Sequence, residues 1–232
     1  MTPGASQNRQ NIVLAVTGAS GVIYAMRLLQ VLLATGARVH LSISPSGALV
    51  MRQELRVELN LDRFDLTALP LASESGAQRN LPSEIQAALA PPPPAAVPSA
   101  GRGELVYHHH RDLMASIASG SFLTSGMVIC PCSGSTLGAV VHGTGENLIH
   151  RAASVHLKER RRLVVVPRET PLSTIHLENM RRAAEAGAVV LPAMPGFYHG
   201  VERIGDLVDF VVARICDALG VENALVHRWG SK

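Results

Sequence analysis

The segment that decides the fold is LVVVPRETPLSTIHLENM, residues 163–180. Its first four residues form a short apolar, β-branched run bounded by Pro167, which is typical of a buried parallel strand, and a serine and a threonine further on can cap the next helix. In an open α/β sheet, ligands bind just beyond the carboxyl ends of the strands. Arg168 and Glu169 occupy that position. The arginine can bind a phosphate or carboxylate and the glutamate can carry a proton; a surface ion pair is the alternative.

Strand and helix patterns alternate along the rest of the chain. Apolar runs predict strands at residues 12–17, 38–44, 127–130, 163–166 and 189–191. Apolar residues spaced three and four apart predict helices at residues 23–33, 136–141, 147–158, 174–186 and 204–219. We therefore predict an α/β fold, a Rossmann/flavodoxin-like, mainly parallel sheet with helices on both faces in three α/β/α layers. Because single domains often reach about 200–250 residues, residues 1–232 are expected to form one domain.

Residues 66–111 interrupt this alternation. The segment is rich in proline, alanine and serine, with four consecutive prolines at 91–94, so that it cannot hold a continuous helix or a central strand. We predict an extended insertion. Its run of His108, His109 and His110 could bind a metal, but consecutive histidines in regular structure cannot all face one ion, and a solvated turn is favoured. No metal site is predicted.

Composition and charge exclude several classes of protein. The net charge of +3 is small, and no basic stripe is interleaved with aromatic residues, so a nucleic-acid partner is not expected. No apolar run approaches the roughly 20 residues that span a bilayer, and residues 1–10 lack a signal-peptide pattern. We expect a cytoplasmic protein without membrane contact. Cys130, Cys132 and Cys216 have neither redox nor zinc spacing and are expected to be buried, reduced thiols.

The first predicted strand leads into TGASG, residues 17–21, a glycine-containing turn that opens a helix. Such a turn offers backbone N–H groups and the positive end of the helix dipole to an anion, and Ser20 adds a hydroxyl. It is neither the three-glycine dinucleotide fingerprint nor a P-loop. Short-chain dehydrogenases also carry Thr-Gly-Ala-Ser, but they need a tyrosine followed four residues later by lysine, and no tyrosine here has that neighbour. That class of hydride-transferring enzyme is therefore disfavoured.

Small polar residues also follow the second and third predicted strands. Ser44 ends the second, and the third continues into CPCSGSTL, residues 130–137. A nucleotide with one phosphate and a polyhydroxyl chain needs several small donors at places where no large side chain blocks its approach. The alternative for Ser133 is that it only caps the following helix.

Further candidates lie late in the chain. Tyr198 follows another predicted strand end, and Arg214 lies in the last predicted helix, so that both could bind a second anion. Their alternatives are a tyrosine at the edge of the core and a solvated arginine. Arg151 and Lys158 lie on the helix before the Arg168 strand, where a salt-bridged helix face is the default expectation.

Together these motifs resemble the UbiX family of flavin prenyltransferases, within the flavodoxin-like flavoprotein group. The likeness covers nearly the whole chain apart from the first residues and the insertion. It rests on TGASG at 17–21, IS at 43–44, ASGS at 118–121, MVICPCS at 127–133, LKERR at 157–161, residues 167–180, PGFYH at 195–199, DLVDFVVAR at 206–214 and RWG at 228–230.

The resemblance implies transfer of a dimethylallyl group from dimethylallyl phosphate to N5 and C6 of reduced flavin mononucleotide (FMN). It implies a metal-independent reaction whose product, prenylated FMN, is the cofactor of a partner UbiD-type decarboxylase. It also implies a homo-oligomer, a dodecamer, with active sites at subunit contacts. Whether the prenyl donor is the monophosphate or the diphosphate stays open.

The resemblance also assigns roles to individual residues. It implies that FMN is held by Gly18, Ala19, Ser20, Ser44, Ser133, Gly134, Ser135, Thr136, Arg151 and Arg168. It implies that the prenyl phosphate is held by Lys158, Tyr198, Arg214, Ser119 and Trp229. Glu169 is the implied proton carrier, with Ser20 and Arg168 as further catalytic residues.

Three positions depart from the family pattern. Leu113 stands where the family has tryptophan, Ile117 where proline is usual, and Pro45 where lysine is expected. These changes bear on the prenyl pocket. One alternative function is an FMN-dependent cysteine decarboxylase of the same fold, but that group uses a Pro-x-Met-Asn clamp that this sequence lacks. The other alternative is a non-catalytic flavin carrier, which would tolerate the loss of Glu169.

Overall fold

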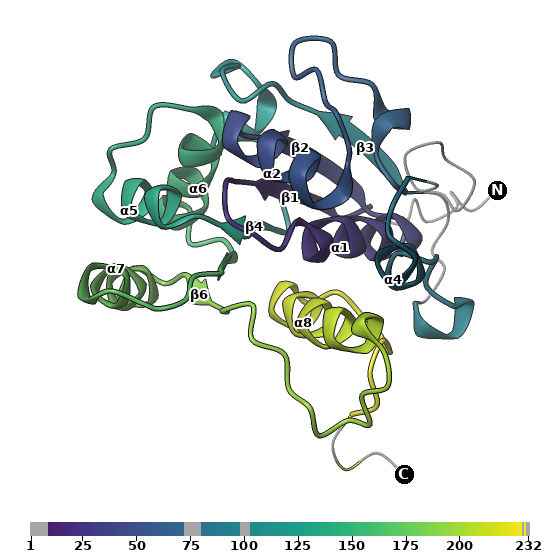
Figure 1. The fold of residues 1–232 in the computed structure, drawn as a ribbon. Helices are drawn as coiled ribbons and strands as arrows, with labels where there is room; N and C mark the ends of the chain where they lie inside the picture. The colour runs from purple at the N-terminus through teal and green to yellow at the C-terminus, as the bar shows by residue number, and fades with distance from the viewer. Residues whose placement is uncertain (1–8, 72–79, 98–102, 229, 231–232) are drawn as a thin grey trace, which may run out of the picture.

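A computed structural model describes residues 9–71, 80–97, 103–228 and 230 (Figure 1). Its centre is a six-stranded sheet in the order β3-β2-β1-β4-β5-β6, in which every neighbouring pair is parallel. The strands are β1 (Asn11–Val16), β2 (Arg38–Ile43), β3 (Glu104–Tyr107), β4 (Gly126–Cys132), β5 (Leu163–Pro167) and β6 (Val189–Val190). The α-helices are α1 (Val22–Ala34), α2 (Pro45–Leu55), α4 (Ser83–Ala88), α5 (Gly134–His142), α6 (Leu148–Lys158), α7 (Thr174–Glu185) and α8 (Ile204–Leu219).

Two apolar cores lie on opposite faces of the sheet. In β1, Leu14 and Val16 pack with α1, α2 and α8, whereas Val13 and Ala15 pack with α5, α6 and α7. All seven residues of β4 are buried, as expected for a central strand that is covered on both faces. The three-layer parallel α/β fold predicted from the sequence is confirmed.

The predicted strands and helices are all present, with ends that differ by a few residues. Three elements were missed: α2, β3 and α4, which lies in the proline-rich segment. Helix α2 buries only three of its residues, so that its apolar periodicity is weak. It is capped by Ser44 and begins at Pro45, and this Ser-Pro start resembles a turn in the sequence. Strand β3 has only four residues, all partly buried at the sheet edge, and it is too short for its periodicity to be detected.

The described parts of residues 66–111 hold no continuous helix and no central strand, as expected, but they are not simply extended. They supply β3, whose Glu104 is opposite Arg38 of β2, and they supply α4, which packs against α8. Short 3-10 turns at Leu66–Ala68, Pro94–Ala96 and, beyond the segment, Ser116–Ala118 complete the connections. The proline run interrupts helices, as expected, but the neighbouring residues dock on the core.

Buried polar contacts of α1 fix the insertion in place. The Arg27 guanidinium, 4% exposed, donates to both carboxylate oxygens of Asp209 on α8, at 2.6 and 2.9 Å. It also donates to the carbonyl of Ala90, and Gln30 donates to the carbonyl of Leu89 at 2.7 Å. The segment is thus held by hydrogen bonds to its backbone, which its side-chain pattern could not indicate.

The histidine run is packed into the protein. His108 Nε2 lies 2.9 Å from Nδ1 of the buried His40, and the two rings stack. Burial, with a smaller effect of the neighbouring His108, lowers the pKa of His40 to about 4. No group of three metal-ligating side chains was found within the described residues.

The three cysteines are buried free thiols, as predicted. Burial raises the pKa of Cys132 and of Cys216 to about 12. Within the described part of the chain, no helix has both the length and the apolar character needed to cross a bilayer.

Candidate active site

The carboxyl ends of β1, β2, β4 and β5 meet along one edge of the sheet, and the turns that follow them contact one another. The Thr17 hydroxyl donates to the carbonyl of Pro131 at 2.7 Å and accepts from the Ser133 amide at 2.9 Å, which ties the turn after β1 to the turn after β4. A Cβ at Gly18 would lie 2.5 Å from Cβ of Ser46, so that only glycine allows α2 to approach this closely. The sequence correctly placed these turns together.

Gly21 brings the turn after β5 into the same cluster. It has a positive φ of 103°, and a Cβ there would lie 3.1 Å from the ring of Tyr24 and 4.0 Å from Cγ of Arg168. Both the left-handed backbone and the close approach require glycine. Arg168 is therefore beside the start of α1.

The start of α1 was expected to be open to an external anion, but a carboxylate of the chain itself occupies it. Glu54 of α2 accepts from the amide of Gly21 at 3.0 and 3.1 Å and from the amide of Val22 at 3.1 Å. A carboxylate is stabilised there by the free N–H groups and by the helix dipole. Sequence reasoning missed Glu54 because it missed α2; the only signal was a glutamate ten residues after a serine that could cap a helix.

The start of α5 is capped from within and still offers donors. The Ser133 hydroxyl accepts from the Thr136 amide at 3.2 Å and lies 3.0 Å from the Thr136 hydroxyl, so that the capping role considered for Ser133 is present. The first-turn amides of Gly134 and Ser135 have no partner within the helix. Ser44 similarly caps α2 by accepting from the Gly47 amide at 3.0 Å. Capping by these serines leaves both helix starts facing the sheet edge.

Arg168 and Glu169 follow β5 directly. Within the described ranges no ion pair includes Arg168, and its buried Nε is without a hydrogen-bond partner. A buried donor without an acceptor costs about 1–3 kcal/mol, so that Arg168 Nε is a candidate donor for a ligand at this edge. Glu169 is exposed, and its carboxylate accepts from the amide of Thr170 at 3.2 Å. The alternative of a surface ion pair between Arg168 and Glu169 is not what the structure shows.

A second cluster joins α6 to the loop before β4. Arg151 Nε donates to the carbonyl of Ala118 at 3.0 Å, and a Cβ at Gly120 would lie 2.9 Å from Lys158 Nζ. Lys158 forms an ion pair with Glu159, and the hydroxyls of Ser119 and Ser121 lie 2.9 Å apart. Because α6 returns from the carboxyl edge of the sheet to the amino end of β5, Lys158 at its last turn lies at the opposite edge from Arg168.

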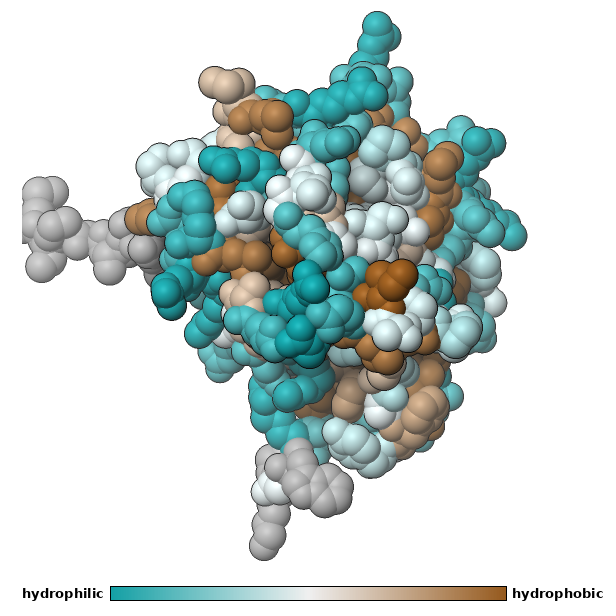
Figure 2. All heavy atoms as spheres, turned by 90° about the vertical axis from the view of Figure 1, so that its left-hand side faces the viewer, coloured by the Kyte–Doolittle hydropathy of each residue, from teal (hydrophilic) through white to brown (hydrophobic). Residues whose placement is uncertain are grey.

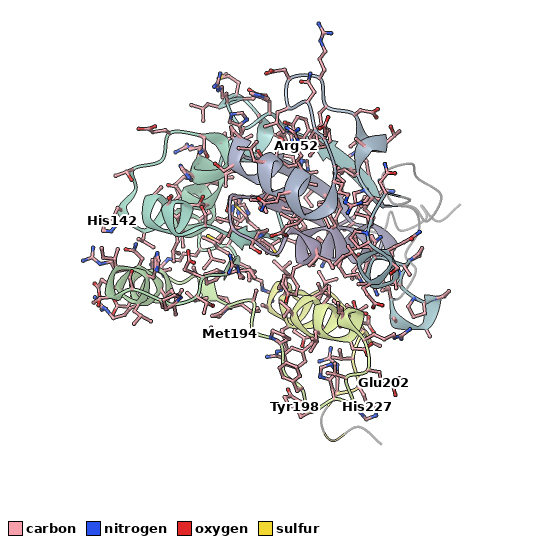
Figure 3. All side chains as sticks on the ribbon, viewed as in Figure 1. Arg52, His142, Met194, Tyr198, Glu202 and His227 are labelled. Carbon is pink, nitrogen blue, oxygen red and sulfur yellow. The ribbon has the colours of Figure 1, made fainter. Side chains whose placement is uncertain are left out.

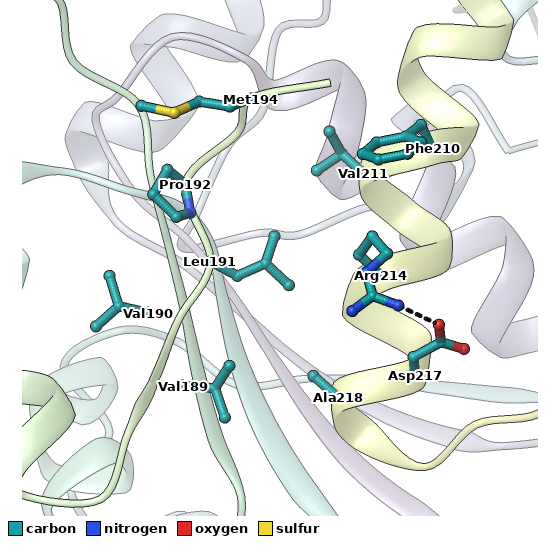
Figure 4. A pocket seen from close by; sticks show the side chains of 10 residues that line it. All are labelled: Val189, Val190, Leu191, Pro192, Met194, Phe210, Val211, Arg214, Asp217 and Ala218. Carbon is teal, nitrogen blue, oxygen red and sulfur yellow. Dashed lines mark hydrogen bonds and ion pairs between the residues drawn. The ribbon is translucent and has the colours of Figure 1, made fainter. Parts of the chain in front are cut away.

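A third cluster lies on α8 and the loop before it (Figure 3). The Tyr198 ring packs edge-on against Phe210, with centroids 5.7 Å apart, and its side chain is 68% exposed. Arg214 pairs with Asp217 at 3.0 Å and lines a cavity of about 450 Å³ between β6 and α8 (Figure 4). Trp229 lies outside the described residues.

The structure of one chain thus gathers only part of the predicted site. Of the predicted flavin residues, Gly18, Ser44, Ser133 and Arg168 share one edge of the sheet, and we call them, with the turns that carry them, the edge cluster. The prenyl-phosphate set does not come together, because α6, which carries Lys158, covers one face of the sheet, whereas α8, which carries Arg214, covers the other.

Comparison with known proteins shows which family the chain belongs to. Residues 2–216 match the Flavoprotein family. The chain is 46% identical to flavin prenyltransferase UbiX of Pseudomonas aeruginosa over 223 residues, covering 96% of this chain and 95% of that protein. It is 42% identical to the flavin prenyltransferase UbiX of Halalkalibacterium halodurans over 217 residues, covering 94% and 92% of the two chains.

Solved structures give the same result. AnUbiX in complex with FMN and dimethylallyl pyrophosphate superimposes with a TM-score of 0.73 at 34% identity, covering 97% of this chain and 99% of that one. A dodecameric FMN-dependent UbiX-like decarboxylase from Escherichia coli O157:H7 superimposes with a TM-score of 0.70 at 34% identity, covering 96% and 100%. The fold and the family match define a flavoprotein. Within that class, the chain belongs to the UbiX family of flavin prenyltransferases.

Proposed function

We propose that this protein is a flavin prenyltransferase that transfers the dimethylallyl group of dimethylallyl phosphate to N5 and C6 of reduced FMN. The single observation that carries the proposal is the unpartnered Arg168 beside Glu169 at the edge cluster, in a chain 46% identical to a flavin prenyltransferase. The cofactor is FMN, in line with the Flavoprotein match.

The residues of the edge cluster fit FMN. The first-turn amides of Gly134 and Ser135 are donors for flavin oxygens, and Arg168 Nε is a buried donor that lacks an acceptor. Ser20, Ala19 and Gly18 present small groups that allow close approach. When bound and reduced, FMN supplies the nucleophilic N5 and C6 positions at which the prenyl unit is added.

Departure of phosphate from an allylic carbon requires cations and hydrogen-bond donors on the leaving group. Lys158, Tyr198 and Arg214 supply these in our proposal, together with Ser119 and Trp229. In our proposal, C1 of the prenyl unit would bond to N5 as its C–O bond to phosphate breaks, and C3 would bond to C6. The N5 proton would go to the phosphate, and the C6 proton would be balanced by a proton added at C2 of the prenyl unit. Glu169, whose carboxylate is exposed beside the cluster, accepts a proton and returns it to the departing phosphate.

Because one chain holds Lys158 and Arg214 on opposite sides of the sheet, a complete phosphate site requires more than one subunit. Exposed apolar side chains support such contacts, notably Met114 at 93% and Leu123 at 73% exposed. Figure 2 shows brown apolar groups interspersed among polar ones on one face. A UbiX-like structure is dodecameric. We propose a homo-oligomer, specifically a dodecamer, with active sites at subunit contacts.

The destination of the product is a proposal that rests on family membership. We propose that prenylated FMN serves a UbiD-type decarboxylase. We also propose that the protein acts in the cytoplasm, because three unpaired thiols are typical of a reducing compartment.

The test is anaerobic incubation with reduced FMN and dimethylallyl phosphate, followed by mass analysis of the extracted flavin. We expect the flavin to gain one prenyl unit, and Glu169→Gln to bind flavin as before while turnover falls by about 10²–10⁴-fold. Glu202→Gln, an exposed carboxylate before α8, is the matched control. Bound flavin that stays unmodified in the wild type would support a carrier instead.

A further inference from the structure

His176 on α7 lies directly against the start of α5. A Cβ at Gly134 would lie 3.0 Å from Nε2 of His176 and 3.2 Å from Cδ2, so that the ring edge packs on the bare backbone of this glycine. One turn further along both helices, a Cβ at Gly138 would lie 3.5 Å from Nδ2 of Asn179. The two glycines therefore allow α7 to approach α5 closely enough to place the imidazole at the edge cluster.

Two hydrogen bonds with Ser173 orient His176 at the start of α7. Its Nδ1 accepts from the Ser173 amide at 3.3 Å, while the His176 amide donates to the Ser173 hydroxyl at 3.2 Å, which completes a capping box. Asn179 is buried at 8% exposure and its carbonyl oxygen lies 3.3 Å from Nε2 of His142. Helix α7 is thereby anchored on α5 through a contact that does not involve His176.

The capping hydrogen bond also decides which ring nitrogen carries the proton. In a neutral imidazole, the nitrogen that accepts has no proton, so the proton of His176 is on Nε2. No hydrogen bond to this Nε2 is found among the described residues. An N–H group that no described protein group accepts from therefore lies beside Gly134 on a partly buried side chain, at the turn where Ser133 caps α5.

We propose that His176 is a further flavin-binding residue, which donates a hydrogen bond from Nε2 to an oxygen atom of bound FMN. This inference rests on the flavin site of the proposed function. Its physical basis is preorganisation, because the capping box and the glycine contact fix the donor before the ligand arrives. The acceptor is either a phosphate oxygen or a carbonyl oxygen of the flavin ring, and these are distinguished by the ligand used.

The test measures the affinity of the apo-protein for FMN and for riboflavin by quenching of flavin fluorescence. His176→Asn keeps an oxygen near the Nδ1 position for the Ser173 amide but cannot reach the flavin, and His176→Gln keeps an N–H group near the Nε2 position. We expect His176→Asn to weaken FMN binding about three- to tenfold, the effect of one neutral hydrogen bond, and His176→Gln to restore most of it. A loss for FMN alone places the acceptor on the phosphate; an equal loss for riboflavin places it on the ring.

His142→Asn is the matched control, because it perturbs the same α5–α7 contact away from the edge cluster. We expect it to lower the melting temperature and to leave FMN affinity unchanged. If His176→Asn binds FMN as tightly as the wild type, while the wild type still prenylates flavin, this inference is overturned and the proposed transferase stands. A wild-type protein that binds no flavin overturns both.

Discussion

Glu54→Gln probes the charge that closes the start of α1. The wild-type carboxylate accepts from the amides of Gly21 and Val22 through contacts of 3.0–3.1 Å. The glutamine keeps one acceptor oxygen, loses the negative charge, and turns an NH₂ group towards a second N–H. A carboxylate at a partly buried helix start contributes up to ~2 kcal/mol, so we expect the free energy of unfolding to fall by about 1.5 kcal/mol.

The assay is equilibrium urea denaturation of the apo-protein, with thermal unfolding as a second measure. For a chain of this length, ~1.5 kcal/mol corresponds to a melting temperature lower by about 3–6 °C. The control is Glu58→Gln, which removes an exposed ion pair with Arg52 at 3.2 Å and should cost less than ~0.5 kcal/mol.

A further consequence separates the dipole effect from simple loss of packing. Without the carboxylate, the amides of Gly21 and Val22 are available to a small anion, so added phosphate should stabilise the Glu54→Gln protein more than the wild type. The reasoning is refuted if Glu54→Gln and Glu58→Gln have the same stability, or if phosphate raises the stability of both variants equally.

Two other outcomes follow from the polar interior. Arg27→Met leaves Asp209 and the carbonyl of Ala90 without their donor, and should lower the free energy of unfolding in urea by about 3 kcal/mol. The double variant Arg27→Met/Asp209→Leu should recover most of that loss. If the losses of the two single variants simply add in the double variant, the ion-pair account is contradicted. The pKa of His40 falls from 6.5 to about 4 on folding, so the unfolded chain binds more protons between these values and stability should fall as pH drops from 6.5 to 4, by about 2.5 kcal/mol. His40→Gln should flatten this pH dependence, and an unchanged slope would exclude His40 as its source.

The fold was predictable where each strand and helix carries its own pattern. The apolar run of β5 and the fully buried β4 are visible in the sequence because a strand covered on both faces must be apolar throughout. β3 was not predictable, because an edge strand of four partly buried residues is defined by its pairing with β2. The docking of residues 80–97 also escaped prediction, since Arg27 recognises a backbone carbonyl and not a particular side chain.

The residues of the candidate site also fall into a part that the sequence predicts and a part that it does not. The turns after β1, β4 and β5 could be grouped from sequence, because parallel strands bring their carboxyl ends to one edge. Glu54 and His176 could not be found, since the role of each depends on the approach of a second helix: Glu54 reaches the start of α1, and His176 rests on Gly134.

By itself, the sequence determined the layered α/β architecture and the edge of the sheet at which the polar turns gather, because apolar periodicity and turn residues act locally. Only the tertiary structure decided which charges face which helix start and which ring nitrogen of His176 carries its proton. It also decided that Lys158 and Arg214 stand apart in one chain. Helices α6 and α8 cover opposite faces of the sheet, and the two residues are therefore separated by the sheet within one chain.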